Sequence, residues 1–213
     1  MPGFGQAATP MEFIVNNWLG LTGFISGVVC VWLLIRENVL TFPVGLIYAV
    51  VSVVAMYGVG LYADVLLNFY YVLMNAYGWY FWLYGGAARR AQDELLVTWV
   101  PKGQWFWLVI IGAAGTSGMG WYFANFTDAS LPYPDSFTTV CSFIAMWMSA
   151  RKYMESWFLW FVVNVISVVL YLIKAGDDSD LYFWAALYAI YIPMAVMGYR
   201  SWRLHLQADP SPA

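Results

Sequence analysis

The sequence predicts an all-α membrane protein in which seven transmembrane helices form two parallel three-helix repeats joined by a single helix, a 3+1+3 arrangement. Three observations lead to this fold class: the composition, the spacing of the charged residues and an internal repeat. Of the 213 residues, 62% are hydrophobic and only 10% are charged, whereas soluble domains carry about 25% charged residues. The same composition excludes disordered, collagen-like and disulfide-stapled chains. A net charge of −3 without a basic patch excludes a nucleic-acid partner, so the lipid bilayer is the expected surrounding.

Charged residues divide the chain into seven uncharged stretches, and the lengths of these stretches identify the spans. A helix that crosses the hydrocarbon core needs about 20 apolar residues, with a range of about 17–25. Six stretches are long enough, and the fifth, with 15 residues, is expected to begin earlier, near Leu131. The alternation that a β-barrel needs is absent, which predicts helices. The stretches are Phe13–Ile35, Asn38–Ala63, Val65–Ala88, Gly103–Thr127, Ser136–Ala150, Ser156–Ile173 and Leu181–Tyr199.

The positive charges predict the direction of the chain, because Lys and Arg gather in cytoplasmic connections. Eight of the nine lie in the odd-numbered connections and the C-terminal segment, whereas Lys174 lies in an even-numbered connection beside three aspartates. With seven spans, the N-terminus is predicted to be outside and the C-terminus cytoplasmic. The eight residues are Arg36, Arg89, Arg90, Lys102, Arg151, Lys152, Arg200 and Arg203.

Comparison of the chain with itself indicates a duplication. At an offset of 120, span three matches span seven at seven positions, from Leu61/Leu181 and Tyr71/Tyr191 to Gly78/Gly198 and Trp82/Trp202. At an offset of 115, Trp32 and Arg36 match Trp147 and Arg151, and 52–54 matches 167–169. Chance within a small apolar alphabet is the alternative, but the shared order and near-constant offset favour duplication. Parallel repeats are a transporter architecture with the substrate between the halves.

The repeat divides the chain into five parts. These are an extracytoplasmic N-terminal tail (1–12), a first three-helix bundle (13–88), a linker with the fourth transmembrane helix (89–130), a second bundle (131–204) and a cytoplasmic tail (205–213).

The sequence favours a protein that is not an enzyme and needs no cofactor or metal. Its single histidine, His205, lies in the predicted cytoplasmic tail, and no carboxylate lies near the middle of a span. Proton-coupled transporters usually keep an acid or histidine inside the membrane. Uniport is therefore the simplest expectation, although a sodium site built from carbonyls and hydroxyls stays open.

Amides and aromatic rings occupy the middle of the spans instead. In span six, residues recur every three or four positions and so share one helix face. Structural alternatives exist: Trp157 suits an interfacial tryptophan belt, and buried asparagines often join helices. The candidate substrate-binding residues are Trp157, Trp160, Asn164 and Ser167 with Tyr171 on the same face, Asn68 and Asn75 in span three, and Tyr188 and Tyr191 in span seven.

Such a face suits a planar ligand with hydroxyl or amide groups that is neutral or carries a delocalised positive charge. Aromatic rings bind such cations over their faces, and amides orient a ligand without the desolvation cost of a full charge. A strongly anionic ligand such as an intact nucleotide would need Arg or Lys in the cavity, and the spans offer none.

The motifs themselves resemble the PnuC family of vitamin transporters. Asn68 follows two leucines and precedes a Tyr-Gly-Trp-Tyr run, like the family's third helix. The second half carries the closer match, which ends in a Trp-x-x-Trp block and an Asn-Val-Ile-Ser-Val-Val run. The matching segments are 66–68, 75–82, 133–136, 150–160 and 164–169.

This resemblance implies a multi-pass protein of the bacterial inner membrane with a fold like that of SWEET sugar transporters. It implies uptake of nicotinamide riboside for NAD synthesis by facilitated diffusion, made one-way by a cytoplasmic nicotinamide riboside kinase. Asn68 departs from the family pattern, where a Gln is expected, so its side chain is one methylene shorter. Thiamine or riboflavin transport on the same fold is one alternative, and a membrane scaffold or receptor is another. A homo-oligomer stays open.

Overall fold

The computed structural model describes residues 10–58, 62–85, 95–175 and 179–208, and these residues form seven helices. The prediction of an all-α chain with seven helices is confirmed, and α5 begins at Pro132, next to the predicted Leu131. At the other end of the chain, α7 continues nine residues beyond the predicted Tyr199. The helices are α1 (Pro10–Ile35), α2 (Thr41–Gly58), α3 (Tyr62–Tyr84), α4 (Lys102–Phe126), α5 (Pro132–Ala150), α6 (Ser156–Ala175) and α7 (Ser179–Ala208).

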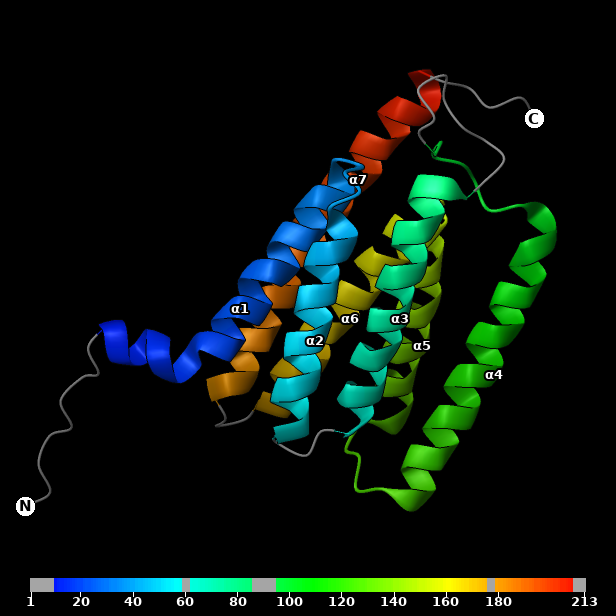
Figure 1. Cartoon of the computed structure of the whole chain (residues 1–213). Helices are drawn as coiled ribbons and strands as arrows, with labels where there is room; N and C mark the ends of the chain where they lie inside the picture. The colour runs from blue at the N-terminus through cyan, green and yellow to red at the C-terminus, as the bar shows by residue number, and fades with distance from the viewer. Residues whose placement is uncertain (1–9, 59–61, 86–94, 176–178, 209–213) are drawn as a thin grey trace, which may run out of the picture.

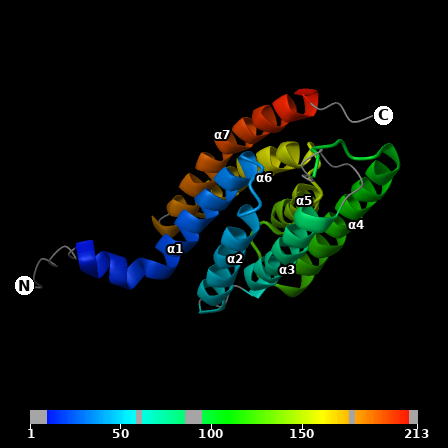
Figure 2. The same cartoon turned by 45° about the horizontal axis from the view of Figure 1, so that its top comes forward.

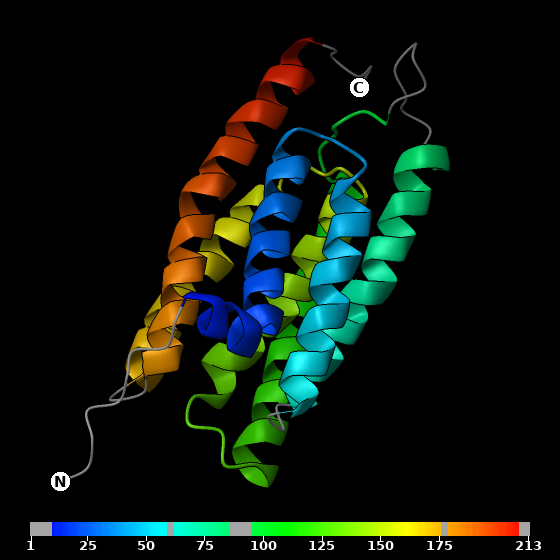
Figure 3. The same ribbon diagram turned by 60° about the vertical axis from the view of Figure 1, so that its left-hand side comes forward.

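Six of the helices form a closed ring, and the seventh lies outside it. Within the first bundle (α1–α3), α2 packs against both α1 and α3; within the second (α5–α7), α6 packs against both α5 and α7. The ring closes where α3 meets α5 and α1 meets α7, while α4 contacts α5 from outside (Figures 1 and 3). Seen from a tilted direction, α4 again stands apart from α1 and α7 (Figure 2).

The outer surface of this ring is apolar, which is typical of a protein surrounded by lipid. In α4 the only buried residue is Gly120, and its aromatic side chains face outward. By length and composition alone, α4 and α6 could each cross a membrane, and shorter apolar helices cover Leu21–Ile35 and Thr41–Val54 within the described residues.

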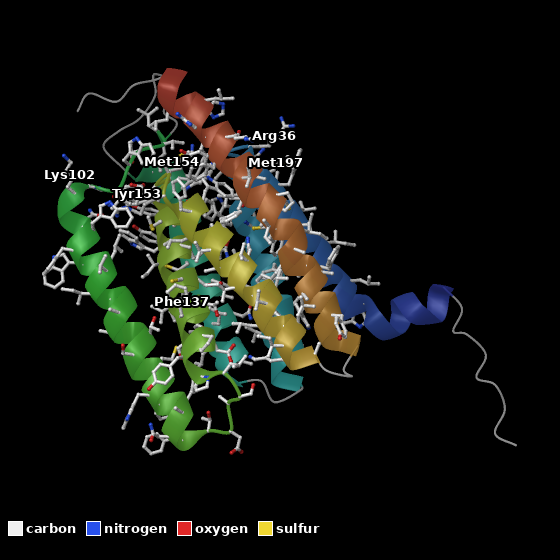
Figure 4. All side chains as sticks on the ribbon, turned by 180° about the vertical axis from the view of Figure 1, so that it is seen from behind. Arg36, Lys102, Phe137, Tyr153, Met154 and Met197 are labelled. Carbon is white, nitrogen blue, oxygen red and sulfur yellow. The ribbon has the colours of Figure 1, made fainter. Side chains whose placement is uncertain are left out.

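Basic residues gather at one end of the ring, which we call the basic end. Arg36 and Lys102 lie there, together with Tyr153 of the α5–α6 connection (Figure 4). Lys174 is bound elsewhere, by the carboxylate of Asp135, with 2.7 Å between Nζ and Oδ2. The grouping agrees with the predicted sidedness; which side of the membrane the basic end faces stays a prediction.

The connections α1–α2 and α5–α6 begin with the same backbone motif. Glu37 and Lys152 both have positive φ, 52° and 57°, in the left-handed region that usually favours glycine. The next residues close the motif, because the N–H groups of Asn38 and Tyr153 donate to the carbonyls of Leu33 and Met148. The two motifs are separated by 115 residues, which is the offset found in the sequence.

The matched glycines of α3 and α7 also have equivalent surroundings. A Cβ on Gly78 would lie 2.3 Å from the Phe42 ring, and a Cβ on Gly198 would lie 2.4 Å from the Trp157 ring. Phe42 meets Trp82 edge-on with ring centroids 4.9 Å apart, and Trp157 meets Trp202 edge-on at 5.3 Å. Phe42 and Trp157 are again 115 residues apart.

Residues 95–100, which precede α4, pack onto the basic end. The N–H of Thr98 donates to the Lys152 carbonyl, and the N–H of Met154 donates to the Thr98 carbonyl. The Val100 N–H donates to the Glu155 carboxylate, which burial nevertheless gives a raised pKa. Leu95 is buried beneath these contacts. This segment therefore covers the start of α6.

Replacing Gly198 with Ala should lower the thermal midpoint in detergent, because the new methyl group overlaps the Trp157 ring and overpacking costs about 1–3 kcal/mol. Gly78→Ala should act in the same direction through Phe42. Gly118→Ala is the matched control, since nothing lies within 4 Å of its added Cβ. Tryptophan fluorescence follows thermal unfolding. Equal midpoints for all three variants would contradict the close packing.

Candidate functional site

The predicted face of α6 lies inside the ring. Trp157, Asn164 and Ser167 are buried, and Trp160 and Tyr171 are partly buried. The opposite face is exposed and carries only apolar side chains: Phe158, Phe161, Val162, Val165, Val169, Leu172 and Ile173. The prediction that the five residues share one face is therefore confirmed, whereas their contact with a ligand stays a prediction.

The two tryptophans of this face occupy different environments. Trp157 is 2% exposed and packs against Gly198 and Trp202, and its indole N–H has no hydrogen-bond partner among the residues that the structure describes. Its burial does not fit the lipid-facing belt that was the structural alternative. Trp160, one turn deeper, donates its indole N–H to the hydroxyl of Ser149 on α5 over 3.0 Å. That bond fixes the plane of the Trp160 ring, and no sequence pattern indicated Ser149 as its partner.

Asn164 provides an unused hydrogen-bonding group in the interior. Its side chain is 4% exposed, and Ser167 nearby is 6% exposed. Within the described part of the chain, neither side chain makes a hydrogen bond. A buried amide without a partner is costly, so a ligand that bonds Asn164 would relieve that cost. Asn164 lies about two helical turns from Trp157 and two from Tyr171.

Tyrosines from three helices meet deeper in the ring. Tyr171 of α6 stacks on Tyr188 of α7 with centroids 5.5 Å apart, and Tyr188 meets Tyr191 edge-on at 6.2 Å. Tyr191 reaches across to the first bundle: a Cβ on Gly27 would lie 2.5 Å from its hydroxyl oxygen and 3.2 Å from the Tyr48 ring. The close approach at Gly27 needs a residue without a side chain.

Two members of this region were missed by the sequence analysis. Tyr48 and Tyr71 both lie within electrostatic range of Tyr188 and Tyr191. A signal for Tyr71 existed, because it matches Tyr191 in the repeat and lies between Asn68 and Asn75 on one helix face. No pattern distinguished Tyr48 from the other aromatic residues.

The two amides of α3 are both buried. Asn75 donates its Nδ2 to the carbonyl of Tyr71 over 2.8 Å, and its Oδ1 lies where a Cβ on Gly45 would be. Asn75 thus bonds its own helix and packs closely against α2 at Gly45, so among the described contacts it is not shown to form the interhelical hydrogen bond of the structural alternative. Asn68, two turns away on the same face, is 6% exposed.

The buried polar side chains within the helices, as far as the structure describes them, are uncharged: serines, one threonine and asparagines. The buried cation Lys152 lies in a connection at the basic end. An open hollow of about 460 Å³ lies along the basic end of α7, away from Tyr188 and Tyr191. It is lined by Tyr199, Arg200, Arg203 and Leu204. The interior therefore suits a neutral ligand or a delocalised cation with hydroxyl groups.

Comparisons with known proteins agree over nearly the whole chain. The sequence model of the family described as nicotinamide mononucleotide transporter matches residues 17–204. The nicotinamide riboside transporter PnuC of Escherichia coli (strain K12) is 28% identical and aligns with 87% of this chain and 85% of its own length. The riboflavin/roseoflavin transporter RibM of Streptomyces davaonensis is 28% identical, covering 92% and 89%. A crystal structure of the vitamin B3 transporter PnuC shares the fold, with a TM-score of 0.74 at 24% identity over 92% of this chain and 85% of that one.

Replacing Asn164 with Leu should leave the thermal midpoint unchanged or raise it, because an unpartnered buried amide is exchanged for an apolar group of similar size. Asn75→Leu is the matched control. It loses the bond to the Tyr71 carbonyl, worth about 0.5–1.5 kcal/mol, and presses a branched side chain against Gly45. If Asn164→Leu lowered the midpoint as much as Asn75→Leu, Asn164 would be a structural residue.

Proposed function

Because the chain belongs to the nicotinamide mononucleotide transporter family, the PnuC family that its motifs predict, we propose that it takes up nicotinamide riboside across the bacterial inner membrane. The observation that carries this substrate is the unpartnered Asn164 amide in an uncharged interior lined by aromatic rings. Nicotinamide riboside combines a pyridinium cation, an amide and a ribose, so rings and amides satisfy each part of it. Relatives named nicotinamide riboside transporters support the same substrate.

In this proposal the α6 face holds the ligand. Trp160 stacks on the pyridinium ring, and its bond to Ser149 keeps the indole plane fixed for stacking. Asn164 and Ser167 bond the amide or the ribose. Tyr188 and Tyr191 contact the ligand from α7, and Asn68 contacts it from α3. Trp157 packs against Trp202 behind the ligand. Asn75 supports the packing of α2 against α3.

The repeat is part of the same proposal. The equivalent motifs at Glu37 and Lys152 and the equivalent glycine contacts support two parallel bundles related by a pseudo-two-fold axis, with α4 as the connecting helix, as in SWEET-like folds. Transport then follows from the two bundles rocking about a site between them. With this topology the basic end faces the cytoplasm.

Uniport is the energetic part of the proposal. No Asp, Glu, Lys, Arg or His side chain is among the buried residues of the described helices, so the usual proton carriers have no evident place there. Uptake then runs down the gradient, and phosphorylation by a cytoplasmic kinase makes it one-way.

Riboflavin is the second candidate substrate, because RibM is as similar in identity as the PnuC relative. Riboflavin is neutral and larger, and its ring system would also stack on Trp160. Thiamine, another aromatic cation, is a third. A scaffold or receptor that transports nothing predicts no ligand-dependent flux.

A titration of purified protein should show saturable binding of nicotinamide riboside, with weaker binding of riboflavin, thiamine, nicotinamide and nicotinamide mononucleotide. The mononucleotide should bind poorly because its phosphate meets no cation among the buried residues of the described helices. Trp160→Phe and Asn164→Leu should each weaken binding about 10-fold or more, since losing a buried hydrogen-bond or stacking partner costs on the order of 1–3 kcal/mol. Calorimetry measures each affinity directly.

Ser142→Ala is the matched control, because this buried hydroxyl bonds only the carbonyl of Thr138 on its own helix. It should bind like the unaltered protein. Unchanged affinity in both site variants would remove the site assignment, and preferential binding of riboflavin would replace the substrate while keeping the family.

Counterflow of labelled substrate into proteoliposomes tests uniport. Its rate should not depend on a pH or sodium gradient across the membrane. Net accumulation driven by either gradient in empty liposomes would contradict uniport.

A further inference from the structure

At the basic end, the two bundles are joined by reciprocal hydrogen bonds from tryptophans. Trp82 of α3 donates its indole N–H to the carbonyl of Ser149 on α5 over 3.3 Å. Trp202 of α7 donates its indole N–H to the carbonyl of Leu34 on α1 over 3.0 Å. The donors are 120 residues apart and the acceptors 115, which are the two offsets of the repeat. The rings contact each other with centroids 6.3 Å apart.

A buried ion pair lies beside the tryptophans. The Lys152 ammonium is 2.6 Å from Glu37 Oε2, and both side chains are less than a tenth exposed. Lys152 also donates to the Leu95 carbonyl and lies 4.6 Å from the centre of the Trp82 ring. Burial acts to raise the pKa of Glu37, but Lys152 and the contacting His205 lower it below its usual value. The Lys152 ammonium thus favours the charged form of Glu37.

The ion pair joins the bundles and uses strained backbone to do so. Glu37 follows α1 in the first bundle, and Lys152 follows α5 in the second. A non-glycine residue with positive φ is strained, and glycine would remove that strain at either place. The sequence nevertheless has Glu37 and Lys152 at these two positions. Neither side chain is needed to end a helix.

Polar contacts between the bundles are unevenly distributed along the ring. Most of those that the structure describes lie at the basic end, where Arg151 also bonds the Tyr77 hydroxyl. One, from the Tyr70 hydroxyl to the Phe143 carbonyl, lies deeper. The Asp135–Lys174 pair towards the opposite end joins α5 to α6 within one bundle. The bundles are consequently held together at the basic end.

We propose that Glu37, Lys152, Trp82 and Trp202 form a gate at the basic end, closed in this structure, which must separate to open the interior to that side. This gate rests on the proposed transport function, because a protein that moves nothing needs no opening. Each of its contacts crosses between the bundles or supports one that does, so rocking of the bundles breaks them together.

Ser149 connects this gate to the proposed binding site. Its carbonyl accepts from Trp82 of the gate, and its hydroxyl accepts from Trp160 of the α6 face. A shift of α5 that breaks the first bond also moves the partner of Trp160. Opening at this end therefore changes the hold on a ligand at the same time.

Cysteine labelling tests the gate without any substrate. Cys30 lies one turn deeper than Leu34 on α1, hydrogen-bonded to Thr41 and within electrostatic range of Tyr191. In a Cys141→Ser background, Glu37→Gln with Lys152→Gln removes both charges, so neither is left buried and unpaired. A membrane-impermeant maleimide should label Cys30 several-fold faster than in the unaltered gate, and only when added at the basic end. Inside-out and right-side-out vesicles give access to the two ends.

Asp135→Asn with Lys174→Gln is the matched control, since it neutralises an ion pair within one bundle. It should leave Cys30 labelling from the basic end unchanged. The double variant Trp82→Phe with Trp202→Phe provides a second route: it keeps the ring packing, removes both cross-bundle bonds and should also speed labelling. Unchanged labelling in a folded gate variant, or an equal increase in the control, would overturn the gate. Failure of the nicotinamide riboside proposal would leave this readout intact, because labelling needs no ligand.

Discussion

Two indole N–H groups, each donated to a main-chain carbonyl of the opposite bundle, set the geometry on which the rest of the ring depends. They fix the approach of α3 to α5 and of α7 to α1, and those approaches close the ring. Gly78 and Gly198, one turn before the two tryptophans, follow from the same constraint. The Phe42 and Trp157 rings, which support the two indoles, occupy the space that a side chain at each glycine would fill. Within lipid, a buried indole N–H gains strongly from an acceptor, so few other residues could serve.

The halves resemble each other at the basic end and differ in the middle. With the offsets of the repeat, Gly45 and Ala49 of α2 stand where α6 has Trp160 and Asn164, and Asn75 of α3 stands where α7 has Ala195. In the first bundle, the small residue is on α2 and the larger one on α3. In the second bundle the order is reversed, with the larger residue on α6 and the small one on α7. The ends that hold the bundles together keep the symmetry, whereas the two bundles bring different rings and amides to the middle, as an asymmetric ligand needs.

Much of the fold could be predicted because the bilayer imposes simple rules: span length, placement of Lys and Arg, and helical periodicity gave the seven helices and the buried faces of α3 and α6. The partners of the candidate residues could not be predicted in this way. Ser149 is one serine among several on α5, and only the packed helices bring it to Trp160. Glu37 and Lys152 lie far apart in the chain, and each alone reads as an ordinary interfacial charge; their pairing depends on backbone geometry that helix patterns do not report. Tyr48 likewise enters the site only through the contact between α1 and α2.

The ion pair between Glu37 and Lys152 has a consequence for how such a chain could arise. In a homodimer of a single three-helix subunit, equivalent positions carry the same residue, so glutamate would face glutamate or lysine would face lysine across the axis. An attractive pair at these positions becomes available only after two gene copies are fused and free to diverge. Once acquired, it also discourages each half from associating with a second copy of itself, since that pairing restores the repulsion between like charges. Under the proposed duplication, the bridge marks the change from a dimer to a single chain and makes that change hard to reverse.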